Sequence, residues 1–356
     1  DVVQAVEEWP ISMSSARMVV GNTAVHEELE ELVASFVGKE AAMVFAMGYG
    51  TNATAIPALM GPGSLLISDS LNHTSIINGA RNSTSLIRVF RHNDPAHLEE
   101  VLKEAIVKGQ PRHHRPWTKI MVMVEGIYSM EGVVCCLPLI VEICKRYKAY
   151  IYVDEAHSIG ALGKTGRGVC EYTGVNPADI DILMGTFTKS FSGMGGYIAA
   201  SKDVIAQLRR HSSGIKYHNS LSPVVCQQIL TAFKVIMGKD GTDIGVKKIA
   251  ALQANSNYFR AAMIRLGLHV YGHTDSPIIP VMIYLPGKIA AFSRECLKRG
   301  LAVVVVGFPA TTVVLSRARF CISAGHTKED LDRAIEIIEE VRALVGLKYH
   351  KNEFGY

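Results

Sequence analysis

The chain has 356 residues, 48% hydrophobic and 20% charged, which is typical of a folded protein large enough for two domains. Its formal net charge of +4 is small and spread along the chain, whereas nucleic-acid binding would need a concentrated basic face, so we expect no nucleic-acid partner. The seven cysteines form no C-x-x-C pair, so neither a disulfide framework nor a metal site is predicted, and a reducing compartment is favoured.

The sequence contains no predicted transmembrane segment. The longest apolar runs, such as 301–306, are far shorter than the roughly 18 residues that cross a bilayer. Asp1 is not a natural start, so we expect a missing N-terminal region that could hold an anchor. The basic stretch 208–218 is interpreted as a solvated helix end, with attraction to a phosphate-bearing substrate or an acidic membrane as the alternative.

After an N-terminal segment (1–38), short β-rich runs alternate with helical patterns such as 95–109 and 137–148. This alternation predicts an α/β domain over 39–236, with a mostly parallel sheet sandwiched by helices. The expected strands are 41–46, 64–69, 85–90, 119–125, 149–155, 181–186 and 196–201.

The pattern changes after a turn-rich break at 238–243. We predict a smaller α+β domain over 237–356, built of helices and short strands in mixed order. The expected elements are a helix at about 245–266, strands near 268–271 and 279–284, a helix at 288–299, strands near 301–306 and 317–323, and a helix at 327–344.

Loops that follow the strands of an open α/β sheet form its ligand cleft. Five such loops, beginning "GYGTN", "SLNHTS", "GIYSMEG", "EAHSIG" and "FTKSF", carry two histidines and a lysine, and an aspartate, Asp154, directly precedes the fourth. The "GYGTNA" stretch (48–53), with Asp69 ending the next strand, also matches a dinucleotide-binding pattern, so a nicotinamide or flavin dehydrogenase is an alternative. The "GKT" at 163–165 is no P-loop, because Ser158 stands where its first glycine would be.

"YVDEAHSIG" (152–160) and, about thirty residues later, "GTFTKSF" (185–191) place Asp154 and Lys189 after neighbouring strands. A partly desolvated lysine can form a Schiff base. Pyridoxal phosphate needs such a lysine together with an acid that keeps its pyridine nitrogen protonated. These two motifs alone leave a structural Asp–Lys pair equally open.

These stretches, with "EGIYSMEG", resemble the α-oxoamine synthases, pyridoxal-phosphate enzymes of fold type I. Within that family, "SDSLNHTSIINGAR" (68–81), "GQPRHHRPW" (109–117) and "VVVVGFPAT" (303–311) are similar to the catalytic, second subunits of eukaryotic serine palmitoyltransferases. The resemblance covers nearly the whole chain. It implies the fold type I architecture with a smaller C-terminal domain.

The resemblance implies a role for each catalytic residue. Lys189 would bind the cofactor aldehyde and serve as acid and base, and Asp154 would pair with the pyridinium nitrogen. His157 would contact the phenolic oxygen, and His73 would stack on the ring and reach the substrate carboxylate. Residues expected around the cofactor phosphate and first shell are Gly48, Tyr49, Asn52, Thr186 and Thr188, with Ser129 and Glu125 as second choices at the rim.

The implied reaction is the decarboxylating condensation of L-serine with palmitoyl-CoA to 3-ketosphinganine. The resemblance also implies a dimer, either with a related subunit that lacks the lysine or with a second copy. It places the protein at the cytosolic face of the endoplasmic reticulum membrane, attached through the missing N-terminal region or through partners.

Two departures from the family pattern concern the substrate side. Gly307 stands where many bacterial relatives have a carboxylate-binding arginine, and Arg319 is the expected replacement, with a structural ion pair as the alternative. Asn219 replaces the residue expected to reach the neighbouring subunit's phosphate. Two other functions stay open, namely a synthase that uses glycine with another acyl-CoA and a non-catalytic scaffold subunit.

Overall fold

The structure is a computed structural model that describes residues 1–347. The chain divides into two compact units. The first comprises Asp1–Ile127 and Cys135–Val246, and the second comprises Tyr128–Val134 and the chain from Lys247 onward. The expected N-terminal segment 1–38 forms part of the first unit, through helices α1 (Val2–Glu8) and α2 (Ala24–Val37).

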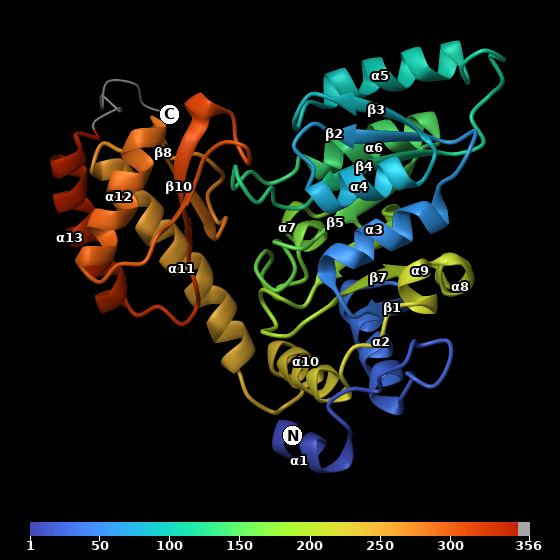
Figure 1. Ribbon diagram of the computed structural model, residues 1–356, viewed down its shortest axis with the longest axis horizontal. Helices are drawn as coiled ribbons and strands as arrows, with labels where there is room; N and C mark the ends of the chain where they lie inside the picture. The colour runs from blue at the N-terminus through green and yellow to red at the C-terminus, as the bar shows by residue number, and fades with distance from the viewer. Residues whose placement is uncertain (348–356) are drawn as a thin grey trace. The chain divides into compact units, whose positions relative to one another are not determined.

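A seven-stranded sheet forms the centre of the first unit (Figure 1). Its strand order is β1-β7-β6-β5-β4-β2-β3, and only β7 runs antiparallel to its neighbours. The predicted mostly parallel sheet is therefore confirmed. The strands are β1 (Ala41–Phe45), β2 (Leu65–Asp69), β3 (Leu86–Phe90), β4 (Ile120–Glu125), β5 (Tyr150–Asp154), β6 (Ile182–Thr186) and β7 (Gly196–Ala200).

Both faces of the central strands β4, β5 and β6 are buried, as expected for a parallel sheet covered by helices. Met123, Tyr152 and Met184 pack on one face with residues of α3 and α8, while their chain neighbours Val122 and Val153 are equally buried on the other. The remaining helices of the unit are α3 (Gly48–Leu59), α4 (Thr74–Asn82), α5 (Pro95–Lys108), α6 (Leu137–Tyr147), α7 (Val169–Thr173), α8 (Lys202–His211), α9 (Ser213–Lys216) and α10 (Pro223–Ile236), with a 3₁₀ turn at Pro177–Asp179.

The second unit contains a three-stranded antiparallel sheet of order β8-β10-β9. Phe259, Phe292 and Ile338, from its three helices, form one core with the strand residues Val281 and Ala318. Its elements are α11 (Ile244–Arg265), which begins at the unit boundary, β8 (Ile278–Tyr284), α12 (Pro286–Lys298), β9 (Val304–Val306), a 3₁₀ turn (Val313–Leu315), β10 (Ser316–Cys321) and α13 (Lys328–Val345).

Two details of this unit differ from the sequence-based expectation. The strand predicted near 268–271 is wrong, since only an isolated bridge between Val270 and Val281 forms there, directly after the left-handed turn at Gly267. Residues 128–134, expected within the large domain, pack with the second unit. Arg317 holds them through its Nη1, which donates to the Met130 carbonyl (2.8 Å) and pairs with Glu131 (3.3 Å).

Helix ends follow their local sequence. Thr327 and Asp330 form a capping box that starts α13, and Asp94 caps α5 ahead of Pro95 at its first position. Within residues 1–347, no helix combines the length and apolar character that a membrane crossing requires.

Candidate active site at the carboxyl edge of the sheet

A cavity of about 280 Å³ lies in the first unit at the carboxyl ends of β4, β5 and β6. Ligands of open α/β sheets bind at this edge. The structure brings nine of the predicted site residues together around the cavity: Gly48, Tyr49, Asn52, His73, Asp154, His157, Thr186, Thr188 and Lys189. Residues from five separate loops or element ends therefore converge on one chamber.

Asp154 ends the buried strand β5 and is itself only 3% exposed. Its Oδ1 accepts a hydrogen bond from the Ala156 backbone N–H (2.9 Å), and its Oδ2 accepts one from Asn52 Nδ2 (2.8 Å). Two donors thus hold the carboxylate in one orientation at the cavity wall. A buried carboxylate held this way is suited to pair with a cationic nitrogen of a ligand.

Glu125 ends the neighbouring strand β4 and lies opposite Asp154 in the parallel register. Burial, and then the Asp154 carboxylate, raise the pKa of Glu125 well above its usual range. Its Oε1 accepts a hydrogen bond from the backbone N–H of His73. The expectation that Glu125 lies at the rim is wrong, because the residue is only 4% exposed and lines the cavity.

His73 precedes helix α4 as its N-cap, and its Nδ1 accepts a hydrogen bond from the Ser75 backbone N–H (3.2 Å). The imidazole stands edge-on to Tyr49, with 6.3 Å between ring centroids. Burial lowers the pKa of His73, with Asp154 raising it and Lys189 lowering it, so the ring is neutral at pH 7. A neutral imidazole at the wall can stack on a planar ligand.

The first turn of α3 forms the opposite part of the chamber. The N–H groups of such a turn have no partner within the helix and attract anions such as phosphate. A Cβ added at Gly48 would approach Thr186 Oγ1 to 2.7 Å, so only glycine leaves this space open. Thr186 and Thr188 hydroxyls lie 2.9 Å apart beside it. A phosphate-bearing cofactor therefore fits these residues.

Lys189 lies on the turn after β6 and His157 follows β5, and both line the chamber with Asp154. The Lys189 residue is exposed, on the bend that follows β6. The lysine is accordingly accessible to an incoming aldehyde.

Asn52, expected in the first shell of the cofactor, lines the chamber, and its amide bonds to Asp154 and Ser75. Ser129 and Arg319 belong to the second unit, where Arg319 Nη1 donates to the Ser129 carbonyl (3.3 Å). Ser75, which the sequence reasoning missed, lines the chamber. Its position two residues after His73 in "NHTS" was the available signal.

Asp69, the residue that a dinucleotide site would use to bind ribose, has a structural role in this protein. Its carboxylate accepts hydrogen bonds from the backbone N–H groups of Leu71 and Asn93 (2.8 Å each) and contacts His92 Nδ1 (3.0 Å). The residue thereby fastens two loops. The glycines of 48–53 lie in the first turn of α3. Asp69, whose carboxylate is occupied by these contacts, does not provide the ribose ligand that a dinucleotide site would need.

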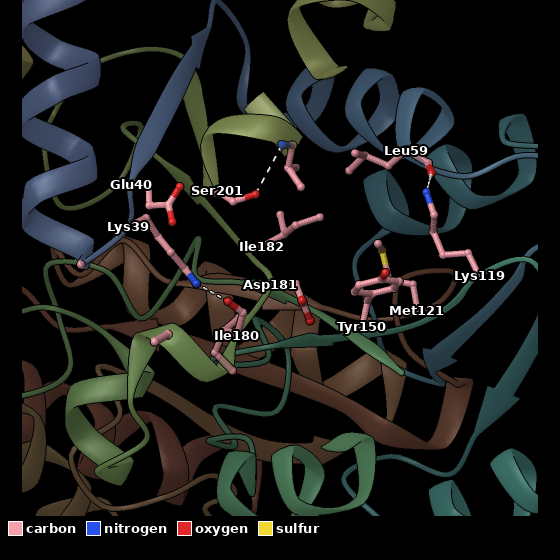
Figure 2. A pocket seen from close by; sticks show the side chains of 13 residues that line it. Lys39, Glu40, Leu59, Lys119, Met121, Tyr150, Ile180, Asp181, Ile182 and Ser201 are labelled. Carbon is pink, nitrogen blue, oxygen red and sulfur yellow. Dashed lines mark hydrogen bonds between the residues drawn. The ribbon is translucent and has the colours of Figure 1, made fainter. Parts of the chain in front are cut away.

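A second cavity, of about 420 Å³, lies at the amino ends of the same strands (Figure 2). The Lys39 ammonium donates to the carbonyls of Pro177 (2.6 Å) and Ile180, and the Lys119 ammonium donates to that of Leu59 (2.6 Å). Asp181 accepts from the Ile151 backbone N–H (2.7 Å). These charged groups hold the strand starts together, whereas the groups suited to chemistry gather at the carboxyl edge.

Comparison with known proteins agrees with this geometry. A family model for aminotransferases of class I and II matches residues 1–338. The chain is 59% identical to long chain base biosynthesis protein 2d of Oryza sativa subsp. japonica, over 98% of this chain and 71% of the relative. It is 53% identical to serine palmitoyltransferase 2 of Dictyostelium discoideum, over 99% of this chain and 72% of the relative.

Among solved structures, a high-resolution structure of SPT (serine palmitoyltransferase) with a pyridoxal-phosphate internal aldimine superposes with a TM-score of 0.89 at 29% identity. The match covers 97% of this chain and 83% of the solved one. The fold type I architecture expected from the sequence is confirmed by this likeness.

Proposed function

Since the chain belongs to the class I and II aminotransferase family, and within it to the serine palmitoyltransferases, we infer that it condenses L-serine with palmitoyl-CoA. The products are 3-ketosphinganine, CoA and carbon dioxide. This is the first step of sphingolipid synthesis, and the enzyme is a pyridoxal-phosphate-dependent acyltransferase. The observation that best supports this chemistry is that four side chains line one chamber: Lys189, Asp154, His157 and His73.

Pyridoxal phosphate, when bound, supplies an electron sink that stabilises negative charge at the serine Cα. We propose that Lys189 holds its aldehyde carbon and afterwards takes and returns the Cα proton. Asp154, fixed by Asn52 and Ala156, keeps a proton on the pyridine nitrogen. His157 would donate to the phenolic oxygen, and the neutral His73 would stack on the ring and contact the serine carboxylate.

The phosphate group would bind at the first turn of α3, at the N–H groups of Gly48 and Tyr49. The Thr188 hydroxyl would add a donor just after β6, next to Thr186, whose own hydroxyl donates to the Gly195 carbonyl (2.9 Å). Ser129 is retained as a weaker candidate for the cofactor, since the segment that carries it belongs to the second unit.

We propose that Arg319 binds the substrate carboxylate, because this chain has Gly307 where the family pattern has the carboxylate-binding arginine. Its guanidinium has one weak hydrogen bond to Ser129, and its Nε has no partner among the described residues. A guanidinium with unused donors suits a planar carboxylate.

The partner and the compartment are further proposals. The chain would form a dimer with a related subunit that lacks the lysine, or with a second copy, and Asn219 lies on an exposed segment available to it. It would work at the cytosolic face of the endoplasmic reticulum membrane, where palmitoyl-CoA is delivered and the lipid product leaves.

The test is product formation in eukaryotic cells that lack their own serine palmitoyltransferase activity. Membranes from cells that express the chain should convert labelled serine and palmitoyl-CoA to labelled 3-ketosphinganine, and those that express Lys189→Ala should not. Because Lys189 is exposed on a turn, its replacement should leave the fold intact, as checked by circular dichroism. Turnover by Lys189→Ala would remove this lysine from its role, and product from glycine in place of serine would point to the related synthase.

A further inference from the structure

A branched chain of hydrogen bonds links the pyridine-side carboxylate to the stacking histidine. Tyr152 Oη lies 2.6 Å from Asn52 Oδ1. Asn52 Nδ2 lies 2.8 Å from Asp154 Oδ2 and 2.9 Å from Ser75 Oγ. Ser75 Oγ in turn lies 2.8 Å from His73 Nδ1. The chain thus runs from β5 through α3 to the first turn of α4.

The direction of every bond in this chain follows from chemistry. A carboxylate only accepts hydrogen bonds, so the Asn52 atom that faces Asp154 is the amino nitrogen, and both of its hydrogens are used, one toward Asp154 and one toward Ser75. The carbonyl oxygen of Asn52 accepts from Tyr152. Since Ser75 Oγ accepts from Asn52, its own hydrogen is available for His73 Nδ1.

The same atom of His73 also receives the Ser75 backbone N–H at 3.2 Å. Two donors therefore converge on Nδ1, which must be the unprotonated nitrogen of the ring. The single proton of the neutral imidazole is then on Nε2, at the far side of the ring from Ser75.

Burial makes this direction hard to reverse. Asn52 and Ser75 are each 1% exposed and Tyr152 is fully buried, so water cannot replace a lost partner. If Nδ1 carried the proton, it would face the Ser75 N–H, and two donors would oppose each other. Between Asp154 and His73, the chain runs only through Asn52 and Ser75, whose side chains do not themselves enter the proposed reaction.

We propose that Asn52 and Ser75 are positioning residues that transmit the acceptor character of Asp154 to His73 and fix it as the Nε2–H tautomer. His73 then presents an N–H donor to the substrate carboxylate. Only this last step rests on the proposed function. The tautomer itself is a property of the folded chain.

The test is the ¹⁵N spectrum of the protein labelled at histidine ring nitrogens, with the His73 signals identified by their loss in His73→Gln. The wild-type protein should show a protonated Nε2 and an unprotonated Nδ1 at pH 7. Asn52→Asp, nearly the same size, should shift the tautomer equilibrium toward the Nδ1–H form. The carboxyl atom that replaces Nδ2 carries at most one hydrogen, drawn to Asp154, so Ser75 turns its hydrogen toward residue 52, and Nδ1 keeps only the longer hydrogen bond from the Ser75 backbone N–H (3.2 Å).

Thr54→Ala on the same helix is the matched control. The Thr54 hydroxyl bonds to the Gly50 carbonyl (2.7 Å) outside the chain of bonds, so its removal should leave the His73 signals unchanged. A protonated Nδ1 in the wild-type protein, or an unchanged tautomer in correctly folded Asn52→Asp, would overturn the proposal. A merely structural role for Asn52 predicts the unchanged tautomer.

Ser75→Ala provides the kinetic measurement in the cofactor-loaded enzyme. It removes the hydroxyl donor to Nδ1 but not the ring, and the serine KM should rise about tenfold, equivalent to about 1.4 kcal/mol. An unchanged KM would overturn the last step of the proposal. Borohydride labelling at Lys189 is read in the same samples, so a failure of the proposed function is seen there and is distinct from a failure at His73.

Discussion

Glu125→Gln tests whether the buried carboxyl group beside the chamber is protonated or ionised. Glutamine keeps an Oε1 atom that can accept the His73 backbone N–H, and it resembles the protonated form of Glu125 in charge and size. If burial keeps Glu125 protonated at neutral pH, the substitution changes little there. We expect kcat/KM at pH 7 to stay within about threefold of wild type, whereas Glu125→Ala, which leaves the N–H without this acceptor, should cost about 1–3 kcal/mol, or about 5–150-fold.

The pH dependence of stability gives the sharper number. The folded-state pKa of Glu125 is raised above the unfolded value of 4.5, so above pH 4.5 the unfolded chain has lost a proton that the folded chain retains. The free energy of unfolding then falls by about 1.4 kcal/mol per pH unit until the folded group titrates. Glu155, whose pKa burial raises to about 7, adds a similar slope, but it is present in both proteins and cancels in the difference.

Urea unfolding measured between about pH 5.5 and 7.5 tests this reasoning. For as long as the folded Glu125 keeps its proton, the stability of Glu125→Gln relative to wild type should increase with pH by about 1.4 kcal/mol per unit. Parallel stability curves for the two proteins would refute the protonated carboxyl, as would a loss of activity in Glu125→Gln as large as that in Glu125→Ala.

Two further substitutions examine the cofactor and substrate sides. Gly48→Ala places a Cβ 2.7 Å from Thr186 Oγ1. The dissociation constant for pyridoxal phosphate, measured by absorbance titration, should therefore rise about tenfold or more. An unchanged constant would show that Gly48 is not part of the phosphate site. Arg319→Ala should raise the serine KM by about tenfold with kcat less affected, as expected for one lost charged hydrogen bond, and an unaltered KM would reject Arg319 as the carboxylate ligand.

The sheet was predictable because its strands carry a strong local signal. Runs such as 119–125 and 181–186 are apolar, short and flanked by turn residues, and both form strands within one residue of the predicted bounds. The strand near 268–271 failed because it lies at the edge of a small sheet. Its few hydrogen bonds, such as that from the Met282 N–H to the His269 carbonyl, depend on tertiary contacts.

The candidate site could be assembled from the sequence only as a set of loops. The rule that ligands lie at strand ends brought Asp154 and Lys189 together, and the structure places both at one chamber. The partners of Asn52 could not be foreseen, since Asp154 lies about a hundred residues away and its direction depends on how α3 packs on the sheet. The burial of Glu125 likewise follows from strand order, which local pattern does not specify.

The central claim is that Lys189 carries pyridoxal phosphate. Purified protein should show a visible absorbance band that borohydride removes, and peptide mapping should then find the reduced cofactor on the peptide that contains "GTFTKSF". A protein without such a band after incubation with pyridoxal phosphate, or a label attached to any other lysine, would contradict the account.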